Sequence, residues 1–140
     1  MADSSPKPNP VRQLRIVVEA EDYDEALTFF RDVLGLPEEE SYAGDGGAQV
    51  TILDAGRATL ELSNPAQVRM IDSVETDGVR SPKFRLAFEV DDSRAVTDRL
   101  VDGGAELLAS PRETPWRSVN ARLHAPGDLQ ITLFQELDEK

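Results

Sequence analysis

Hydrophobic and polar residues alternate with a period of two in several short stretches, and two of these stretches open similar units. The first stretch spans 14–19, and its alternating apolar members are Leu14, Ile16 and Val18. This period predicts a strand with one buried face. A helical spacing of apolar residues follows over 22–34, and Gly35 suits the left-handed position after a helix. About seventy residues later the same order returns, which indicates an internal repeat.

The repeat predicts an α+β fold of two tandem βαβββ modules, at 11–64 and 83–137. The first module has a helix that begins at Asp22, with Glu25 placed as in a capping box, and strands at 48–53 and 58–63. The second has strands at 84–90, 118–124 and 129–135 and a helix at 93–102. Weaker patterns predict strands near 38–43 and 105–109. Residues 65–82 form a linker with a short helix over a cleft, and residues 1–10 form a disordered tail.

Composition limits the function classes. The chain has 140 residues, 39% of them hydrophobic, which is enough for one compact domain. Its net charge of −12 argues against nucleic acid and against an anionic membrane as partners. It has no cysteine, so disulfides and thiolate chemistry are excluded. Without a transmembrane pattern or a signal peptide, the expected location is the cytoplasm.

Strand alternation separates a core face from an inward polar face. The expected core positions are Leu14, Ile16, Leu60, Leu86, Phe88, Ile131 and Leu133. The expected inward positions include Arg15, Glu61, Arg85, Thr132 and Phe134. Two roles are open for the arginines. They pair with the inward carboxylates Glu19, Glu61 and Glu89, or they contact a ligand's oxygen or aromatic ring.

Two motifs resemble the vicinal oxygen chelate superfamily, which contains glyoxalase I, extradiol dioxygenases and bleomycin-resistance proteins. Residues 22–36, beginning Asp-Tyr-Asp-Glu-Ala-Leu, resemble the opening signature of that superfamily. Residues 125–131 resemble its late turn, with Gly127 and Asp128 transposed. The resemblance covers about 12–136. It implies an eight-stranded, cup-shaped mixed sheet with helices on its outer face, commonly in a homodimer.

Metal-dependent members of this superfamily carry four ligands on inward strand faces. In this chain those positions fall on Arg15, Glu61, Arg85 and Thr132. Arginine has no lone pair to donate, and two guanidinium groups would repel a divalent ion. One carboxylate and one hydroxyl are too few for such a site. We therefore expect no metal and no other cofactor, and no metal-dependent glyoxalase or dioxygenase activity.

Other residues are candidates for the rim of the cup. Trp116 lies in a proline-flanked loop, where it forms either a stacking wall for a flat ligand or a core or dimer contact. Met70 supplies an adaptable apolar lip. Tyr42 belongs either to the pocket or to the core, and His124 is expected to be a solvent-facing turn residue.

These features predict a metal-free homodimer that binds a large, partly aromatic antibiotic in a cleft between the chains. Sequestration of this kind would confer self-resistance and requires no catalytic residue. Enzymatic activity is left open. One alternative is a metal-independent isomerase, cyclase or lyase that uses Glu61 or His124, and another is a regulatory or accessory dimer with an empty cup.

Overall fold

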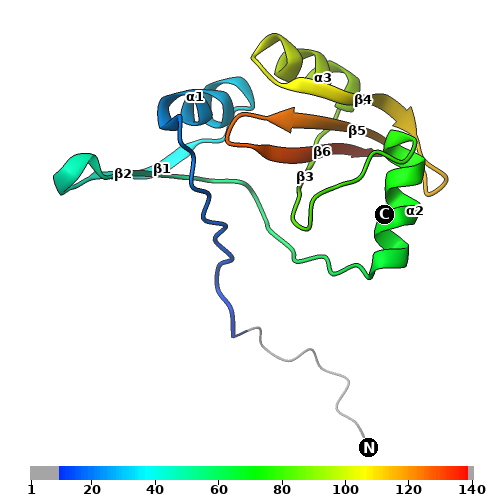
Figure 1. The fold of residues 1–140 in the computed structure, drawn as a ribbon, viewed down its shortest axis with the longest axis horizontal. Coiled ribbons are helices and arrows are strands. Elements are labelled where there is room, and N and C mark those ends of the chain that lie inside the picture. The colour runs from blue at the N-terminus through cyan, green and yellow to red at the C-terminus, as the bar shows by residue number, and fades with distance from the viewer. Residues whose placement is uncertain (1–9, 139–140) are drawn as a thin grey trace, which may run out of the picture.

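A computed structural model describes residues 10–138 of the chain. The predicted disordered tail, residues 1–10, lies outside this range except for Pro10. The fold is α+β, as predicted, with the elements distributed unequally between the two halves (Figure 1). No helix in the described range is long and apolar enough to cross a membrane.

The second half forms a four-stranded sheet in the order β3-β6-β5-β4. Its strands are β3 (Leu86–Glu89), β4 (Glu106–Glu113), β5 (Ser118–Ala125) and β6 (Leu129–Glu136). Strand β3 pairs parallel to β6, with Leu86 opposite Ile131, and the other pairs are antiparallel. Helix α3 (Ser93–Asp102) begins after Asp92, whose side chain accepts from the Ala95 amide at 3.1 Å. The predicted strands and helix of this half are confirmed.

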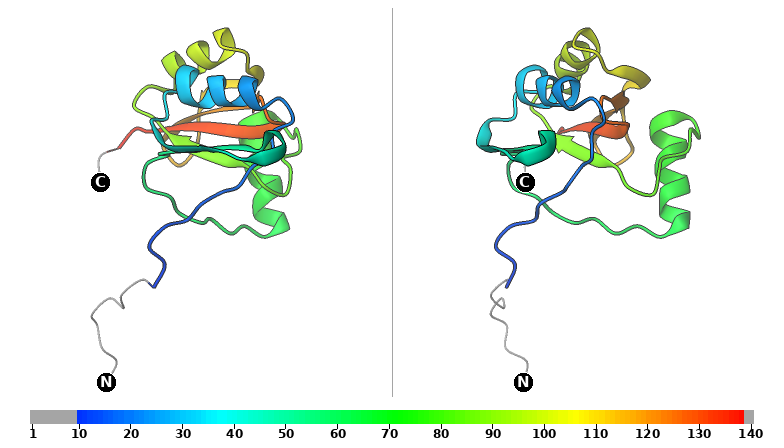
Figure 2. Two further views of the ribbon diagram at one scale, coloured as in Figure 1. Left: turned by 90° about the vertical axis from the view of Figure 1, so that its left-hand side faces the viewer. Right: turned by 60° about the vertical axis from the view of Figure 1, so that its left-hand side comes forward.

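The hydrophobic core lies on one face of this sheet, beneath helices from both halves. Helix α1 (Tyr23–Leu27) continues as the π-helix η1 (Thr28–Val33) and lies beside α3 on that face (Figures 1 and 2). The fully buried side chains include Phe29, Leu100, Leu123, Ile131 and Leu133. Alternation along β5 and β6 sends these apolar residues toward the helices and their polar neighbours to the opposite face.

Local signals at the first helix behave as the sequence predicts. The Asp22 side chain accepts from the Glu25 amide at 3.0 Å and caps the first turn of α1. Gly35 has a φ of 97°, a left-handed conformation that glycine adopts without steric cost. The hairpin of β1 (Glu38–Ala43) and β2 (Gln49–Leu53), joined by the 3₁₀ turn η2 (Asp45–Gly47), forms a separate two-stranded sheet.

Two predicted strands of the first half are absent, so the eight-stranded cup is not formed by residues 10–138. Segments 14–19 and 58–63 are extended but have no strand partner, and the described residues contain six strands in two sheets. Leu14, Ile16 and Leu60, expected in the core, are 42%, 44% and 72% exposed. An extended segment becomes a strand only when its backbone N–H and C=O groups meet another edge. The segment before α1 leads away from the sheet, and the segment between β2 and α2 reaches α2 without joining it (Figure 1).

The predicted linker contains a well-formed helix, α2 (Pro65–Thr76). Asn64 caps it by accepting from the Gln67 amide at 2.9 Å, and Pro65 occupies the first turn, where a missing N–H costs nothing. Asp77, with a φ of 57°, ends the helix. Helix α2 lies against the sheet face opposite α1 and α3 (Figure 2), so it covers part of the polar face.

Candidate ligand-binding site

A cavity of about 850 Å³ lies between the polar face of the sheet, helix α2 and residues 61–63. This volume falls within the range of about 300–1,000 Å³ typical of small-molecule pockets. Six of the eight predicted site residues line it: Glu61, Met70, Arg85, Trp116, Thr132 and Phe134. The structure thus brings these six side chains together, and their role in ligand binding stays a prediction.

Arg15 and Tyr42, the other two predicted site residues, lie outside this cavity. Arg15 is exposed and donates to the Gln13 side chain at 3.1 Å. Tyr42 is 57% exposed on β1, in the separate hairpin. Arg15 lies in a segment that pairs with no strand of residues 10–138, and the β1–β2 hairpin that carries Tyr42 is a sheet separate from the one beside the cavity.

A buried ionic network lies between β5 and α2, next to the cavity. The Arg122 side chain, fully buried on β5, donates to Asp72 at 3.0 Å and to Glu75 at 2.7 Å, both on α2. It also donates to Gln130 at 2.9 Å. Asn120 donates to the second oxygen of Glu75 at 2.7 Å. These bonds fasten α2 across the sheet, and one cation between two carboxylates leaves the network with one net negative charge.

This network was not among the predicted features, although two signals in the sequence point to it. The apolar residues of 118–124 occupy alternate positions, which places Asn120 and Arg122 on the opposite, polar face. Asp72 and Glu75 are three residues apart, so a helix over 65–76 presents both carboxylates on one side. Neither pattern predicts which residues form the ion pairs, because the strand and the helix are about fifty residues apart in the sequence.

Asp72 is held ionised by its surroundings. Burial by itself would raise the pKa of its carboxyl group, but hydrogen bonds from the Ser81 amide, Arg122 and the Ser81 hydroxyl outweigh burial and lower that pKa. The charged form is therefore the one that the fold stabilises.

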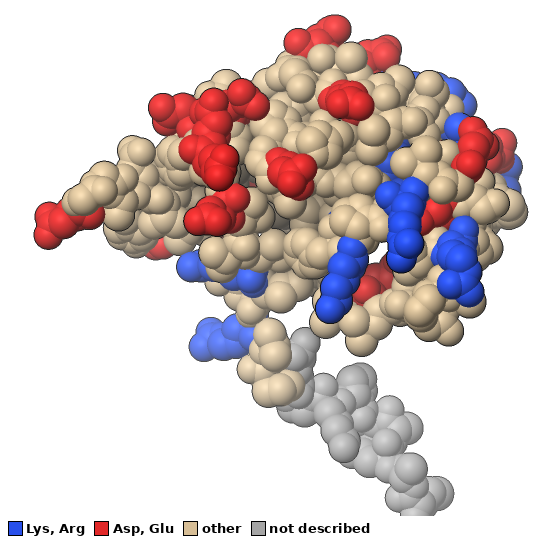
Figure 3. Space-filling view, in the orientation of Figure 1, with Lys and Arg blue, Asp and Glu red and all other residues tan. Residues whose placement is uncertain are grey.

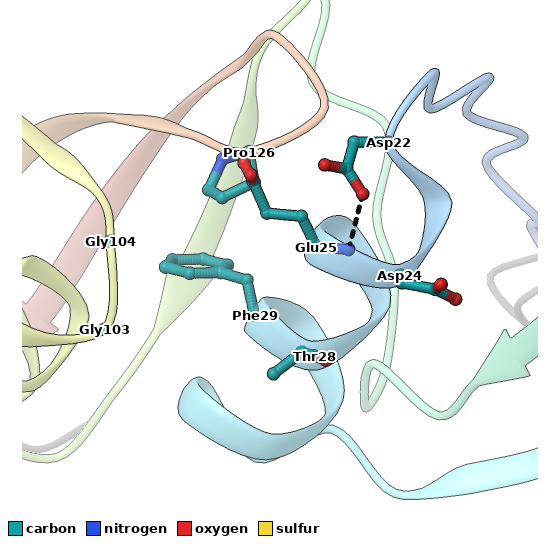
Figure 4. A pocket seen from close by; sticks show the side chains of 8 residues that line it. All are labelled: Asp22, Asp24, Glu25, Thr28, Phe29, Gly103, Gly104 and Pro126. Carbon is teal, nitrogen blue, oxygen red and sulfur yellow. Dashed lines mark hydrogen bonds between the residues drawn. The ribbon is translucent and has the colours of Figure 1, made fainter.

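A second recess, of about 610 Å³, lies on the helical side of the sheet (Figure 4). It is bounded by the start of α1, the Gly103–Gly104 turn and Pro126, and it contains none of the predicted site residues. The Asp22 carboxylate at its edge is already engaged in capping α1. His124 lies in neither hollow: it is partly exposed and contacts Asp128 at 2.9 Å, as expected of a residue beside the turn.

Comparison with known proteins identifies the family. A profile described as "Glyoxalase-like domain" matches residues 15–134, most of the chain. The chain belongs to the glyoxalase-like domain family. This assignment, together with the names of its structural neighbours, confirms the resemblance to the vicinal oxygen chelate superfamily. No functionally curated protein matches the sequence significantly.

Solved structures share the fold of this glyoxalase-like domain. TnmS3, described as an antibiotic binding protein from Streptomyces sp. CB03234, superposes with a TM-score of 0.61 at 21% identity, covering 92% of this chain and 99% of its own. A glyoxalase family protein from Bacillus cereus gives a TM-score of 0.59 at 18% identity, covering 96% and 100%. A glyoxalase/bleomycin resistance protein from the same Streptomyces gives 0.52 at 22% identity, covering 83% and 93%.

The metal of many superfamily members does not fit the corresponding residues of this glyoxalase-like domain. Arg85 donates a hydrogen bond to the Thr132 hydroxyl, so a guanidinium occupies the space beside that potential ligand. Arg15 lies elsewhere, and Glu61 is the only one of the four that carries a strong metal-binding oxygen. Residues 10–138 contain no cluster of three or more His, Asp or Glu side chains arranged to hold a metal ion.

Proposed function

We propose that this protein sequesters a partly aromatic natural-product antibiotic, without a metal, in the cavity beneath α2. The observation that carries the proposal is the composition of the lining. Trp116 and Phe134 offer aromatic surface, Met70 an adaptable contact, and Arg85 a hydrogen-bonding cation, all around one space. Most of the other lining residues are polar or charged, so the cavity can contact an aromatic ring and several polar groups of one ligand.

Binding without turnover is favoured over catalysis. The lining has no cysteine or histidine, and Arg122 already engages Glu75, the buried carboxylate of the lining. His124, one candidate acid or base, contacts Asp128 outside the lining. The description of TnmS3 as an antibiotic binding protein adds support by analogy of fold. Self-resistance in the cytoplasm is the corresponding biological role.

The same proposal includes a homodimer that completes the eight-stranded cup. Strand β3 ends the four-stranded sheet with one edge unpaired, and segments 14–19 and 58–63 are extended without partners in the described chain. The unpaired backbone N–H and C=O groups at the edge of β3 could form hydrogen bonds with those of a strand-like segment from a second copy. Pairing with a second copy would also cover Ile16 and Leu60 and bring Arg15 toward the cavity.

A titration tests sequestration. Doxorubicin, tetracycline and bleomycin are added to the protein while Trp116, its only tryptophan, reports by fluorescence. We expect quenching by at least one compound, recovery of that compound unaltered by mass spectrometry, and improved growth of a sensitive host that expresses the protein. Phe134→Ala should weaken binding, and Val101→Ala, at an exposed position of α3 outside the lining, should not. Chemical change in the recovered compound would favour an enzyme instead.

Light scattering coupled to gel filtration tests the dimer. The wild type and Ile16→Val should elute as dimers. Ile16→Pro should elute as a monomer, because proline removes the backbone donor that strand pairing needs. A monomeric wild type would refute this part of the proposal and leave sequestration to be judged by the titration.

A further inference from the structure

Arg85 is a half-buried cation in the cavity with no carboxylate partner. Its guanidinium donates to the neutral Thr132 hydroxyl, and within residues 10–138 no carboxylate oxygen forms an ion pair with it. The pairing with Glu19, Glu61 or Glu89 that the sequence suggested is therefore absent. A guanidinium carries five N–H donors, so Arg85 retains donors for another acceptor.

The nearest buried carboxylates are already engaged. Asp72 accepts from Arg122 and from Ser81, and Glu75 accepts from Arg122 and Asn120. Burial, and then the Arg122 charge, lower the pKa of Arg85, while Glu75, Asp72 and Glu61 oppose this. Arginine nevertheless stays protonated in proteins, so the cavity holds a cation that no carboxylate of the described residues contacts directly.

A buried cation is stabilised when an anionic acceptor enters with matching geometry. Trp116 and Phe134 line the same cavity as Arg85, so one occupant of moderate size can contact an aromatic wall and the guanidinium together. Arg117, the other arginine of the lining, already pairs with Glu113 and Asp138. Arg85 is thus the cation available to a ligand.

We infer that the cavity selects aromatic ligands bearing an anionic oxygen, a carboxylate or a phenolate, which Arg85 binds while Trp116 or Phe134 contacts the ring. This inference rests on the proposed function and specifies its ligand class. Glu61 weakens the preference of the cavity for anionic ligands. Its carboxylate lies on the same lining without an ion-pair partner in the described chain, so it repels an incoming anion.

Three naphthalene probes of similar size test the charge requirement: 2-naphthoate, neutral 2-naphthamide and cationic 2-naphthylmethylamine. Each is titrated by calorimetry against the full-length protein. We expect 2-naphthoate to bind roughly 10-fold to 100-fold more tightly than 2-naphthamide, the ratio that a hydrogen bond to a charged group provides. The cationic probe should bind most weakly.

Variants assign the preference to Arg85. Arg85→Gln should remove the preference for 2-naphthoate over 2-naphthamide, and Arg85→Lys should retain part of that preference. Glu61→Gln should strengthen 2-naphthoate binding several-fold. Arg112→Gln is the matched control, because Arg112 pairs with Asp77 and is absent from the lining. Circular dichroism and urea midpoints check that each variant folds.

The outcomes separate this inference from the proposed function. If 2-naphthoate and 2-naphthamide bind equally, or if antibiotics bind and neither naphthalene does, the charge requirement is wrong and sequestration stands. The inference is also overturned if Arg85→Gln folds and keeps the wild-type preference. If neither the antibiotics nor the probes bind, both proposals are wrong.

Discussion

Removal of the Arg122 guanidinium should destabilise the protein severely. Arg122→Met keeps much of the side-chain volume but leaves Asp72 and Glu75 buried without their cation. The two carboxylate side chains are only 6% and 4% exposed, so water cannot replace the lost bonds at 3.0 and 2.7 Å. Breaking a buried ion pair on one side costs about 3–5 kcal/mol of unfolding free energy. For a chain of this size, that lowers the melting temperature by about 10–20 °C.

The reason for the loss can be tested separately from its size. In Arg122→Met combined with Asp72→Asn and Glu75→Gln, the amide oxygens still accept from Ser81 and Asn120, but no charge is buried. We expect this triple variant to regain more than half of the lost stability. Neutralising a whole buried ionic group is far less costly than orphaning part of it.

Urea denaturation at pH 7, followed by circular dichroism, measures both variants. At acidic pH the difference in unfolding free energy between Arg122→Met and the wild type should become smaller, because the unpaired carboxylates are then protonated. A loss below about 1 kcal/mol for Arg122→Met would show that the network adds little net stability. A triple variant as unstable as the single one would attribute the loss to packing rather than to charge.

Three further predictions concern local features. The lowered pKa of Asp72 stabilises the fold above its unfolded value of 3.8, and this stability is lost as pH falls through the folded pKa. Between neutral and acidic pH, the free energy of unfolding should therefore fall less steeply for Asp72→Asn than for the wild type. Gly103→Ala should lower the free energy of unfolding, measured in urea, by about 1–3 kcal/mol, because the new Cβ would collide with the Val33 side chain. In a double-variant cycle, Val33→Ala should reduce this loss. Asn64→Ala should cost about 1 kcal/mol through loss of the α2 cap, a prediction contradicted by an unchanged urea midpoint.

The surface charges are unevenly distributed, a feature that the net charge alone does not reveal. In Figure 3 acidic side chains gather over α1 and the β1–β2 hairpin, while much of the visible basic surface lies toward α2 and β4. The cavity itself is lined by four acidic residues, Glu61, Glu75, Glu136 and Asp138, and by two arginines, Arg85 and Arg117. Arg122 engages Glu75 and Arg117 engages Asp138, so a preference for an anionic ligand depends on Arg85 and not on the overall charge.

The sequence by itself determined the elements whose signals are local. Periodicity placed β5, β6 and α3, and Asp22 and Gly35 marked the ends of the first helix, because capping and left-handed turns depend on neighbouring residues. Alternation along strands also placed Arg85, Thr132 and Phe134 on one face, and the structure brings them to one cavity. These features need no knowledge of distant segments.

Tertiary structure decided everything that requires a partner. Segments 14–19 and 58–63 have strand-like patterns, yet a strand forms only beside another edge, and within residues 10–138 neither segment pairs with one. Arg85 was expected either to pair with Glu19, Glu61 or Glu89 or to contact a ligand. Its hydrogen-bond partner in the structure is Thr132, and the buried carboxylates Asp72 and Glu75 pair with Arg122. Pairings between residues about fifty positions apart depend on how helix and sheet meet in space, which periodicity does not encode.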